Sequence, residues 1–133
     1  MLSAPRQVVA IAAWGAFACW AGLLWYLSSQ PPHNLVNLSF PHIDKVAHFV
    51  YFAAGAFALA IALKSGFGWG EGATFAAGVF VMAMIGIFDE WRQTMTPGRT
   101  GGDCMDFTAD VAGAMAGLAV ALGVYGRFRK YPG

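Results

Sequence analysis

The sequence predicts an all-α integral membrane protein, a four-helix bundle that forms a single domain over residues 1–133. Hydrophobic residues make up 58% of the chain and charged residues 11%, compared with roughly 45–50% and about 25% in an average soluble domain. A chain of this composition has too few polar residues to form the surface of a water-soluble protein. The chain also contains four apolar runs that each approach the roughly 20 residues needed to cross a bilayer as a helix.

The first predicted span covers residues 8–27, within a stretch that carries no charge between Arg6 and Asp44. The alternative is a cleaved signal peptide, whose apolar core has only about 7–15 residues and ends at a cleavage site of small residues. Here the apolar run is longer, and Ser28-Ser29-Gln30-Pro31-Pro32 follows it, which favours a membrane span. The other three spans are predicted at residues 46–63, 72–88 and 107–125.

Lysine and arginine residues predict the orientation, because connections rich in these residues stay in the cytoplasm. The side of the two termini carries Arg6, Lys64, Arg127, Arg129 and Lys130. The opposite side carries Lys45, Arg92 and Arg99, together with all the acidic residues except Glu71. We therefore expect both termini in the cytoplasm and the protein in the inner (cytoplasmic) membrane of the cell. With a formal net charge of +1 and no basic run before the C-terminal end, nucleic acid is not expected as a partner.

Small residues recur in all four predicted spans and include a GxxxG unit at Gly113 and Gly117. Such residues let helix backbones approach closely where lipid supplies no hydrophobic drive for association. We expect this unit to serve packing within a tight bundle rather than a dimer interface.

Ionisable residues gather at the outer ends of the predicted helices, where by default they mark a functional site. Three pairs have helical spacing, which places each pair on one helix face: Asp44 with His48, Glu90 with Gln93, and Asp106 with Asp110. Arg99 lies in the connection between the third and fourth spans. We expect these groups to converge, either as an interfacial salt-bridge network or as a site with a proton-transferring histidine, carboxylates that orient it or bind a metal, and a guanidinium that holds an anion.

Two carboxylates one turn apart near the membrane, Asp106 and Asp110, would repel each other unless something offsets their charge. One account is that Asp110 is protonated and donates a hydrogen bond. The other is that a cation, either Arg99 or a divalent metal, lies between the two side chains.

The order of these motifs resembles the VanZ-like membrane proteins over nearly the whole chain. The resemblance rests on Ser28-Ser29-Gln30-Pro31, Asp44-Lys45-x-x-His48-Phe49-x-x-Phe52, Glu90-x-x-Gln93-x-x-x-Pro97-Gly98-Arg99 and Asp106-x-x-x-Asp110-x-x-Gly113. Two positions depart from the family pattern, which usually has tyrosine in place of Phe52 and asparagine in place of Asp110.

The resemblance implies a membrane enzyme that acts on phosphate-linked headgroups of lipids or on lipid-linked cell-envelope precursors, with a link to teicoplanin resistance. His48 would be the base or nucleophile, oriented by Asp44 or Glu90, and Arg99 would hold the phosphate. Asp106 and Asp110 would position a hydroxyl, a water or a divalent cation, and Lys45 and Gln93 are the other family positions expected to contact substrate.

Two other readings of the same residues stay open. A non-catalytic membrane protein that binds a lipid headgroup, an antibiotic or a partner protein would use the same pocket. The spacing Gly102-x-x-x-Asp106-x-x-x-Asp110 also matches the end of the CDP-alcohol phosphotransferase signature, whose first half is missing here. Ion conduction is disfavoured, because the ionisable residues lie at one side and none lies within residues 8–27.

Overall fold

The computed structural model describes residues 4–31 and 42–130, and within them the chain forms four α-helices and no β-strand. The helices are α1 (Ala4–Ser28), α2 (Ile43–Phe67), α3 (Glu71–Thr94) and α4 (Cys104–Lys130). Each predicted span lies inside one helix, and all four helices are long and apolar enough to cross a membrane. The predicted all-helical class, with four helices that are long and apolar enough to cross a membrane, is therefore confirmed.

The helices extend beyond the predicted spans, most of all at the end of α3, which continues from Phe88 to Thr94. A helix does not end where its hydrophobic run ends, because backbone hydrogen bonds continue through polar residues as long as a packed face supports them. As a result, Asp89, Glu90 and Gln93 lie on a rigid helical turn rather than in a loop.

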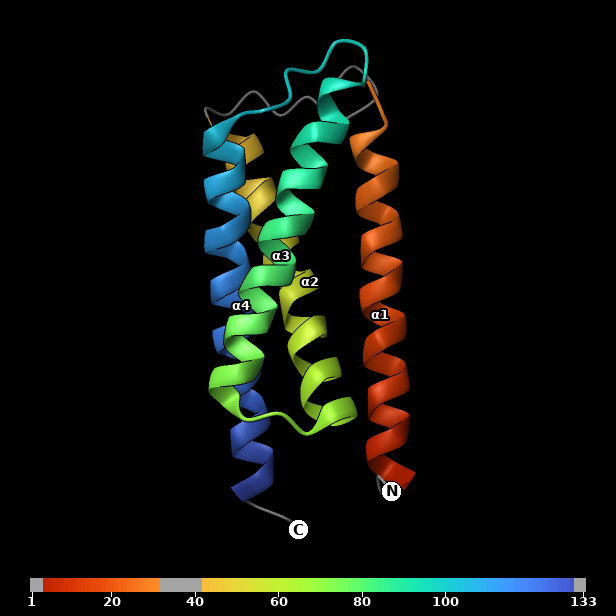
Figure 1. Ribbon diagram of the computed structural model, residues 1–133, viewed down its shortest axis with the longest axis vertical. Helices are drawn as coiled ribbons and strands as arrows, with labels where there is room; N and C mark the ends of the chain where they lie inside the picture. Colours follow the sequence, from red (N-terminus) through yellow and green to blue (C-terminus); the bar gives the residue numbers. More distant parts are fainter. Residues whose placement is uncertain (1–3, 32–41, 131–133) are drawn as a thin grey trace.

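The four helices run alternately up and down, so that the first residues of α1 and the last residues of α4 lie at the same end (Figure 1). At that end α2 is joined to α3 by a short connection, which begins with Gly68 in the left-handed conformation (φ 70°). The opposite end holds the end of α1, the start of α2, the end of α3 and the start of α4. This topology brings all the predicted polar motifs to one end of the bundle.

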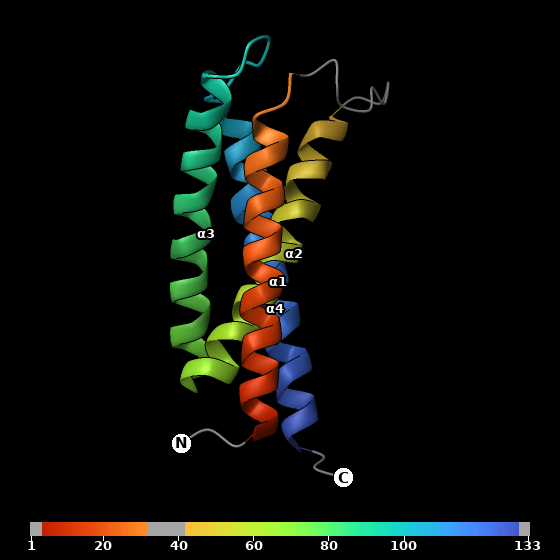
Figure 2. The same cartoon turned by 90° about the vertical axis from the view of Figure 1, so that its right-hand side faces the viewer.

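Helices α2 and α4 form the central pair, with α1 packed on α2 and α3 packed on α4 (Figure 2). The backbones of α2 and α4 touch at the two glycines of the GxxxG unit. A Cβ at Gly113 would overlap the carbonyl oxygen of Phe49, and a Cβ at Gly117 would overlap that of Ala53. The GxxxG unit therefore serves packing inside the bundle, as predicted.

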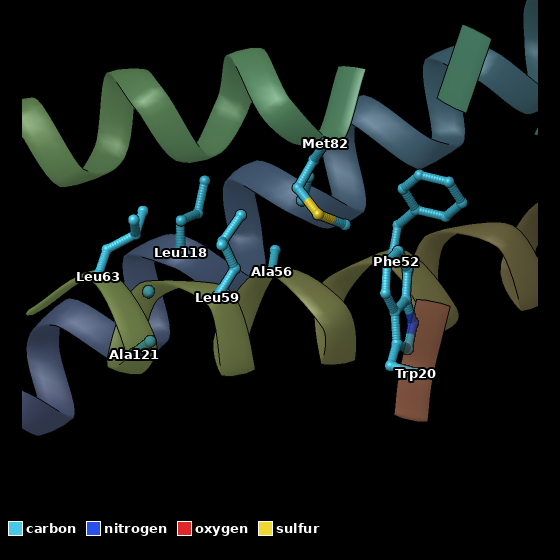
Figure 3. Close-up of a cluster of buried hydrophobic side chains, with 10 residues drawn as sticks. Trp20, Phe52, Ala56, Leu59, Leu63, Met82, Leu118 and Ala121 are labelled. Carbon is cyan, nitrogen blue, oxygen red and sulfur yellow. The ribbon is translucent and has the colours of Figure 1, made fainter. Parts of the chain in front are cut away.

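The apolar core lies along α2, with contributions from the other helices (Figure 3). Trp20 joins α1 to this core, because its ring fills the space beside Gly55 on α2. The Trp20 indole donates a hydrogen bond to the backbone oxygen of Tyr51, and the Tyr51 hydroxyl donates one to the backbone oxygen of Trp20, both at 2.9 Å. These bonds satisfy two polar groups that would be costly to leave unpaired within a bilayer.

Candidate functional site

Buried polar side chains gather at the end of the bundle where the four motifs meet. Ser28 from α1 and Asp89, Glu90 and Gln93 from α3 are each at most 6% exposed, and Asp110 from α4 is fully buried. The predicted convergence of the polar motifs is therefore found in the fold, because the antiparallel topology sets these helix ends side by side.

The imidazole of His48 on α2 contacts Asp110 on α4, with His48 Nδ1 2.8 Å from Asp110 Oδ1. When Asp110 is ionised it only accepts hydrogen bonds, so the ring donates from Nδ1, and in the neutral imidazole Nε2 then keeps a lone pair. Nε2 lies 4.0 Å from Asp106 Oδ2, which is beyond hydrogen-bond distance. The pair leaves one ring nitrogen free to take a proton.

The structure differs from the sequence prediction on what orients this ring, since Asp110 does so in place of Asp44 or Glu90. Asp44 lies in the first turn of α2, its side chain is 59% exposed, and it pairs with Lys45 at 3.0 Å. The spacing of four places Asp44 and His48 on one face of α2. At the helix end, however, the nearest cation attracts the carboxylate more strongly than the neutral ring.

Lys45 connects the start of α2 to the start of α4. Its Nζ lies 2.6 Å from Asp103 Oδ2 and 2.6 Å from Asp106 Oδ1, in addition to the contact with Asp44. The hydrogen bond from Lys45 holds the pKa of Asp103 below its usual range. Asp106 and Asp110 thus contact different partners, Lys45 and His48, and Arg99 forms an ion pair with neither of them.

Asp89 and Glu90, near the end of α3, place two further carboxylates at this end of the bundle. The side-chain amide of Gln93 donates to Asp89 Oδ2 at 2.7 Å, and the Ser28 hydroxyl donates to Asp89 Oδ1. The backbone N–H of Asp103 donates to Glu90 Oε2 at 2.8 Å.

Sequence reasoning did not select Asp89 or Ser28 as site residues, although both lie in the motifs that carried the resemblance or beside them. Asp89 could have been selected because it is an acidic residue directly after an apolar run. Since α3 continues through this position, Asp89 is buried inside the bundle. Ser28 was identifiable as the first polar residue after the first span.

A cavity of about 240 Å³ opens beside these groups and is lined by residues from α1, α2, α3 and the connection between α3 and α4. Its polar walls are Ser28, His48, Asp89, Gln93 and Arg99, and its apolar walls are Leu24, Leu27, Ala47, Tyr51 and Phe52. The guanidinium of Arg99 forms no ion pair with any residue in the described parts of the chain. An unpaired cation in a cavity of this kind is suited to bind an anion.

A second, mainly apolar groove of about 190 Å³ lies between α1 and α3 and shares Leu24, Ser28 and Asp89 with the cavity. Its other walls include Ala21, Trp25, Ile85 and Phe88. At its polar end, Arg92 donates to the Ser29 hydroxyl oxygen at 2.8 Å and lies over the ring of Trp25, 4.7 Å from its centroid. The cavity and the apolar groove therefore lie next to each other and share part of their lining.

Fold and site together define a multi-pass membrane protein with a histidine–aspartate pair and an unpaired arginine at one end of a four-helix bundle. The model of one protein family, described as VanZ/LLP1, matches residues 13–125 and so includes the greater part of all four helices. The chain belongs to the VanZ/LLP1 family, which confirms the resemblance found in its motifs. Comparison with curated proteins and with solved structures found no match.

Proposed function

We propose that this protein is an enzyme that acts on phosphate-linked headgroups of membrane lipids or lipid-linked cell-envelope precursors in the outer leaflet of the inner membrane. The observation that carries the proposal is that His48, which is paired with Asp110, and the unpaired Arg99 line one cavity at the end of the four-helix bundle. The distribution of lysine and arginine supports an outward-facing cavity.

Arg99 is the phosphate-binding residue in this proposal. A guanidinium binds two oxygens of a phosphate at once and keeps its charge at any physiological pH. Lys45, which the sequence also suggested for substrate contact, is occupied by three carboxylates. Lys45 therefore acts as a positioning residue that holds the start of α4 against α2.

His48 is the general base. Asp110 accepts a hydrogen bond from the Nδ1–H of His48 and so leaves the lone pair of Nε2 available. Nε2 takes the proton of a water or of an acceptor hydroxyl, whose oxygen forms a bond to phosphorus while the P–O bond to the leaving group breaks. The imidazolium then returns the proton to the leaving oxygen, so that hydrolysis and headgroup transfer differ only in the attacking hydroxyl.

The groove between α1 and α3 supports a lipid rather than a soluble substrate. A lipid whose phosphate lies near Arg99 can leave its hydrocarbon chain between Leu24, Ile85 and Phe88, where apolar walls continue towards the bilayer. The chain then stays in an apolar environment while the headgroup reaches the polar end.

Mass spectrometry of lipids from membranes with and without the protein tests this proposal. We expect one phosphate-containing lipid class to change in abundance with the wild-type protein and to stay unchanged with Arg99→Ala or His48→Ala present at equal abundance. Teicoplanin susceptibility of the same cells supplies a second readout. A purified protein that binds a lipid at one molecule per chain and leaves it chemically intact would instead support the non-catalytic reading.

A further inference from the structure

Four ionisable side chains from three helices surround one point beside the cavity. His48, Asp89, Glu90 and Asp110 each place one donor atom within 4.8 Å of the donor atoms of the other three. The three carboxylates are at least nine-tenths buried, with Asp89 4%, Glu90 6% and Asp110 0% exposed. Groups this close and this buried interact strongly, because little water screens them.

The charges in this cluster do not balance. Three carboxylates face a single imidazole, and Lys45 is held by Asp44, Asp103 and Asp106 outside the cluster. Neutral donors orient Asp89, namely Ser28 and Gln93, and supply no positive charge. A buried carboxylate is strongly disfavoured unless it is protonated or paired with a positive charge, and a bound cation would supply that charge.

Two oxygens of the cluster are without a hydrogen-bond partner. Glu90 has one oxygen anchored by the backbone N–H of Asp103, while Oε1 is buried and unpaired. Asp110 has Oδ1 anchored by His48, while Oδ2 is buried and unpaired. In each of these two carboxylates, one oxygen accepts a hydrogen bond and the other has no partner. Carboxylates that bind a metal ion are often oriented in this way, by a hydrogen bond to the oxygen that does not contact the metal.

The open oxygen of Asp110 is directed towards α3. A Cβ built on Gly86, one turn before Glu90, would lie 3.2 Å from Asp110 Oδ2. The absence of a side chain at Gly86 thus lets the α4 carboxylate reach the face of α3 that carries Asp89 and Glu90.

We infer that Asp89, Glu90 and Asp110 bind a hard divalent cation of the Mg²⁺ or Mn²⁺ type, while His48 holds Asp110 from the other side. Carboxylate oxygens are the ligands that these ions prefer. Neighbouring ligands of such an ion are about 3 Å apart and opposite ligands about 4.2 Å apart, so the donor atoms, which lie within 4.8 Å of one another, would move closer together around the ion.

The cation would also serve the proposed reaction, and this part of the inference rests on the proposed function. Asp89 and His48 line the cavity that contains Arg99, so an ion on Asp89 faces a bound phosphate from another side. Its charge would attract phosphate oxygens and offset the negative charge that develops as the P–O bond breaks. Binding of the cation itself does not depend on any substrate.

Binding of Mn²⁺ to the untagged full-length chain in detergent, after treatment with a chelator, tests the inference. Electron paramagnetic resonance of free Mn²⁺ measures the bound fraction, and Mg²⁺ is added as a competitor. We expect one Mn²⁺ per chain, displaced by Mg²⁺. Asp89→Asn and Glu90→Gln keep the size of the side chain and should each weaken Mn²⁺ binding by about tenfold or more.

Glu71→Gln is the matched control, since it removes one acidic charge from the same helix at the opposite end of the bundle. It should bind Mn²⁺ as the wild type does. Folded wild-type protein that binds no Mn²⁺, or Asp89→Asn and Glu90→Gln variants that bind it as tightly as Glu71→Gln, would overturn the inference. Lipid turnover by chelator-treated protein would show that the reaction needs no metal ion and would leave the proposed function intact. Mn²⁺ binding without any change in lipids would support the cation site and contradict the proposed function.

Discussion

His48 Nδ1 and Asp110 Oδ1 lie 2.8 Å apart across the interface of α2 and α4, next to one of the two close backbone contacts that the glycines allow. Phe49, whose carbonyl oxygen lies against Gly113, directly follows His48 in the sequence, and Gly113 comes three residues after Asp110. The glycine contact therefore determines how near the ring and the carboxylate can come. The stretch Asp106-x-x-x-Asp110-x-x-Gly113 of this chain therefore combines the carboxylate with the residue that positions it.

Gly113→Ala should separate the two helices at the level of the histidine. The added methyl group overlaps the Phe49 carbonyl oxygen, so the backbone must shift, at an expected cost of about 1–3 kcal/mol in stability. Lipid turnover should fall with it, because His48 and Asp110 move apart. Gly123→Ala on the same helix meets nothing within 4 Å and is the control. Thermal unfolding in detergent, measured with lipid turnover, would contradict this account if both variants behaved alike.

His48→Gln should abolish turnover while the protein stays inserted and abundant. Loss of a general base typically lowers the rate by about 10²–10⁴-fold. If the polar residues only stabilised the helix ends, the main effect would instead be lower stability, because Asp110 would be left buried without its partner. His42→Asn is the control, since His42 is exposed and adopts a left-handed backbone (φ 59°) that asparagine tolerates. Lipid analysis and melting temperature are measured for each variant.

Asp110→Asn should retain part of the activity, and Asp110→Ala should lose nearly all of it. The asparagine oxygen can still accept the hydrogen bond from His48 Nδ1, but the lost charge weakens the proposed cation site. Activity of the asparagine variant should therefore rise towards the wild-type value as Mn²⁺ is increased, whereas the alanine variant should not respond. An asparagine variant that is folded but inactive at every Mn²⁺ concentration would show that the charge is needed to stabilise the imidazolium.

Arg99→Ala should weaken substrate binding more than it destabilises the fold. Hydrogen bonds to a charged group contribute about 1.5–3 kcal/mol, which corresponds to about 10–150-fold in kcat/KM. Since Arg99 makes no ion pair with the described residues, its removal should leave the melting temperature unchanged within error. Arg99→Lys should be intermediate, because an ammonium binds phosphate without the bidentate geometry. A large drop in melting temperature with unchanged KM would assign Arg99 a structural role.

Cys104 provides a native probe of orientation. It is exposed at the first residue of α4, at the polar end of the bundle, whereas Cys19 lies in the middle of α1. We expect a membrane-impermeant maleimide to label Cys104 on intact cells and to fail with Cys104→Ser. A cysteine placed at Gly70 in the Cys104→Ser chain should react only after the membrane is permeabilised. The opposite labelling pattern would place the cavity in the cytoplasm and exclude an outer-leaflet substrate.

Several features of this protein follow from the sequence alone because they depend on local properties. Membrane insertion sums hydrophobicity over about 20 consecutive residues, so each of the four spans was readable from composition. Each span crosses in the opposite direction to the one before it, so the first and third connections lie on the same side. The motifs at Asp44, Glu90 and Asp106 were therefore bound to meet at one end.

The pairing of individual groups was decided by the tertiary structure. Which side chain meets His48 depends on how α2 and α4 are rotated about their axes and shifted along each other. That register is set by non-local packing, such as Phe49 against Gly113, and not by spacing within either helix. The same register brings Asp110 rather than Asp44 to the imidazole and Lys45 to Asp106, and the packing of α3 brings Asp89 to Ser28. Helical periodicity predicts the face on which a residue lies, but only the packing of whole helices determines what that face contacts.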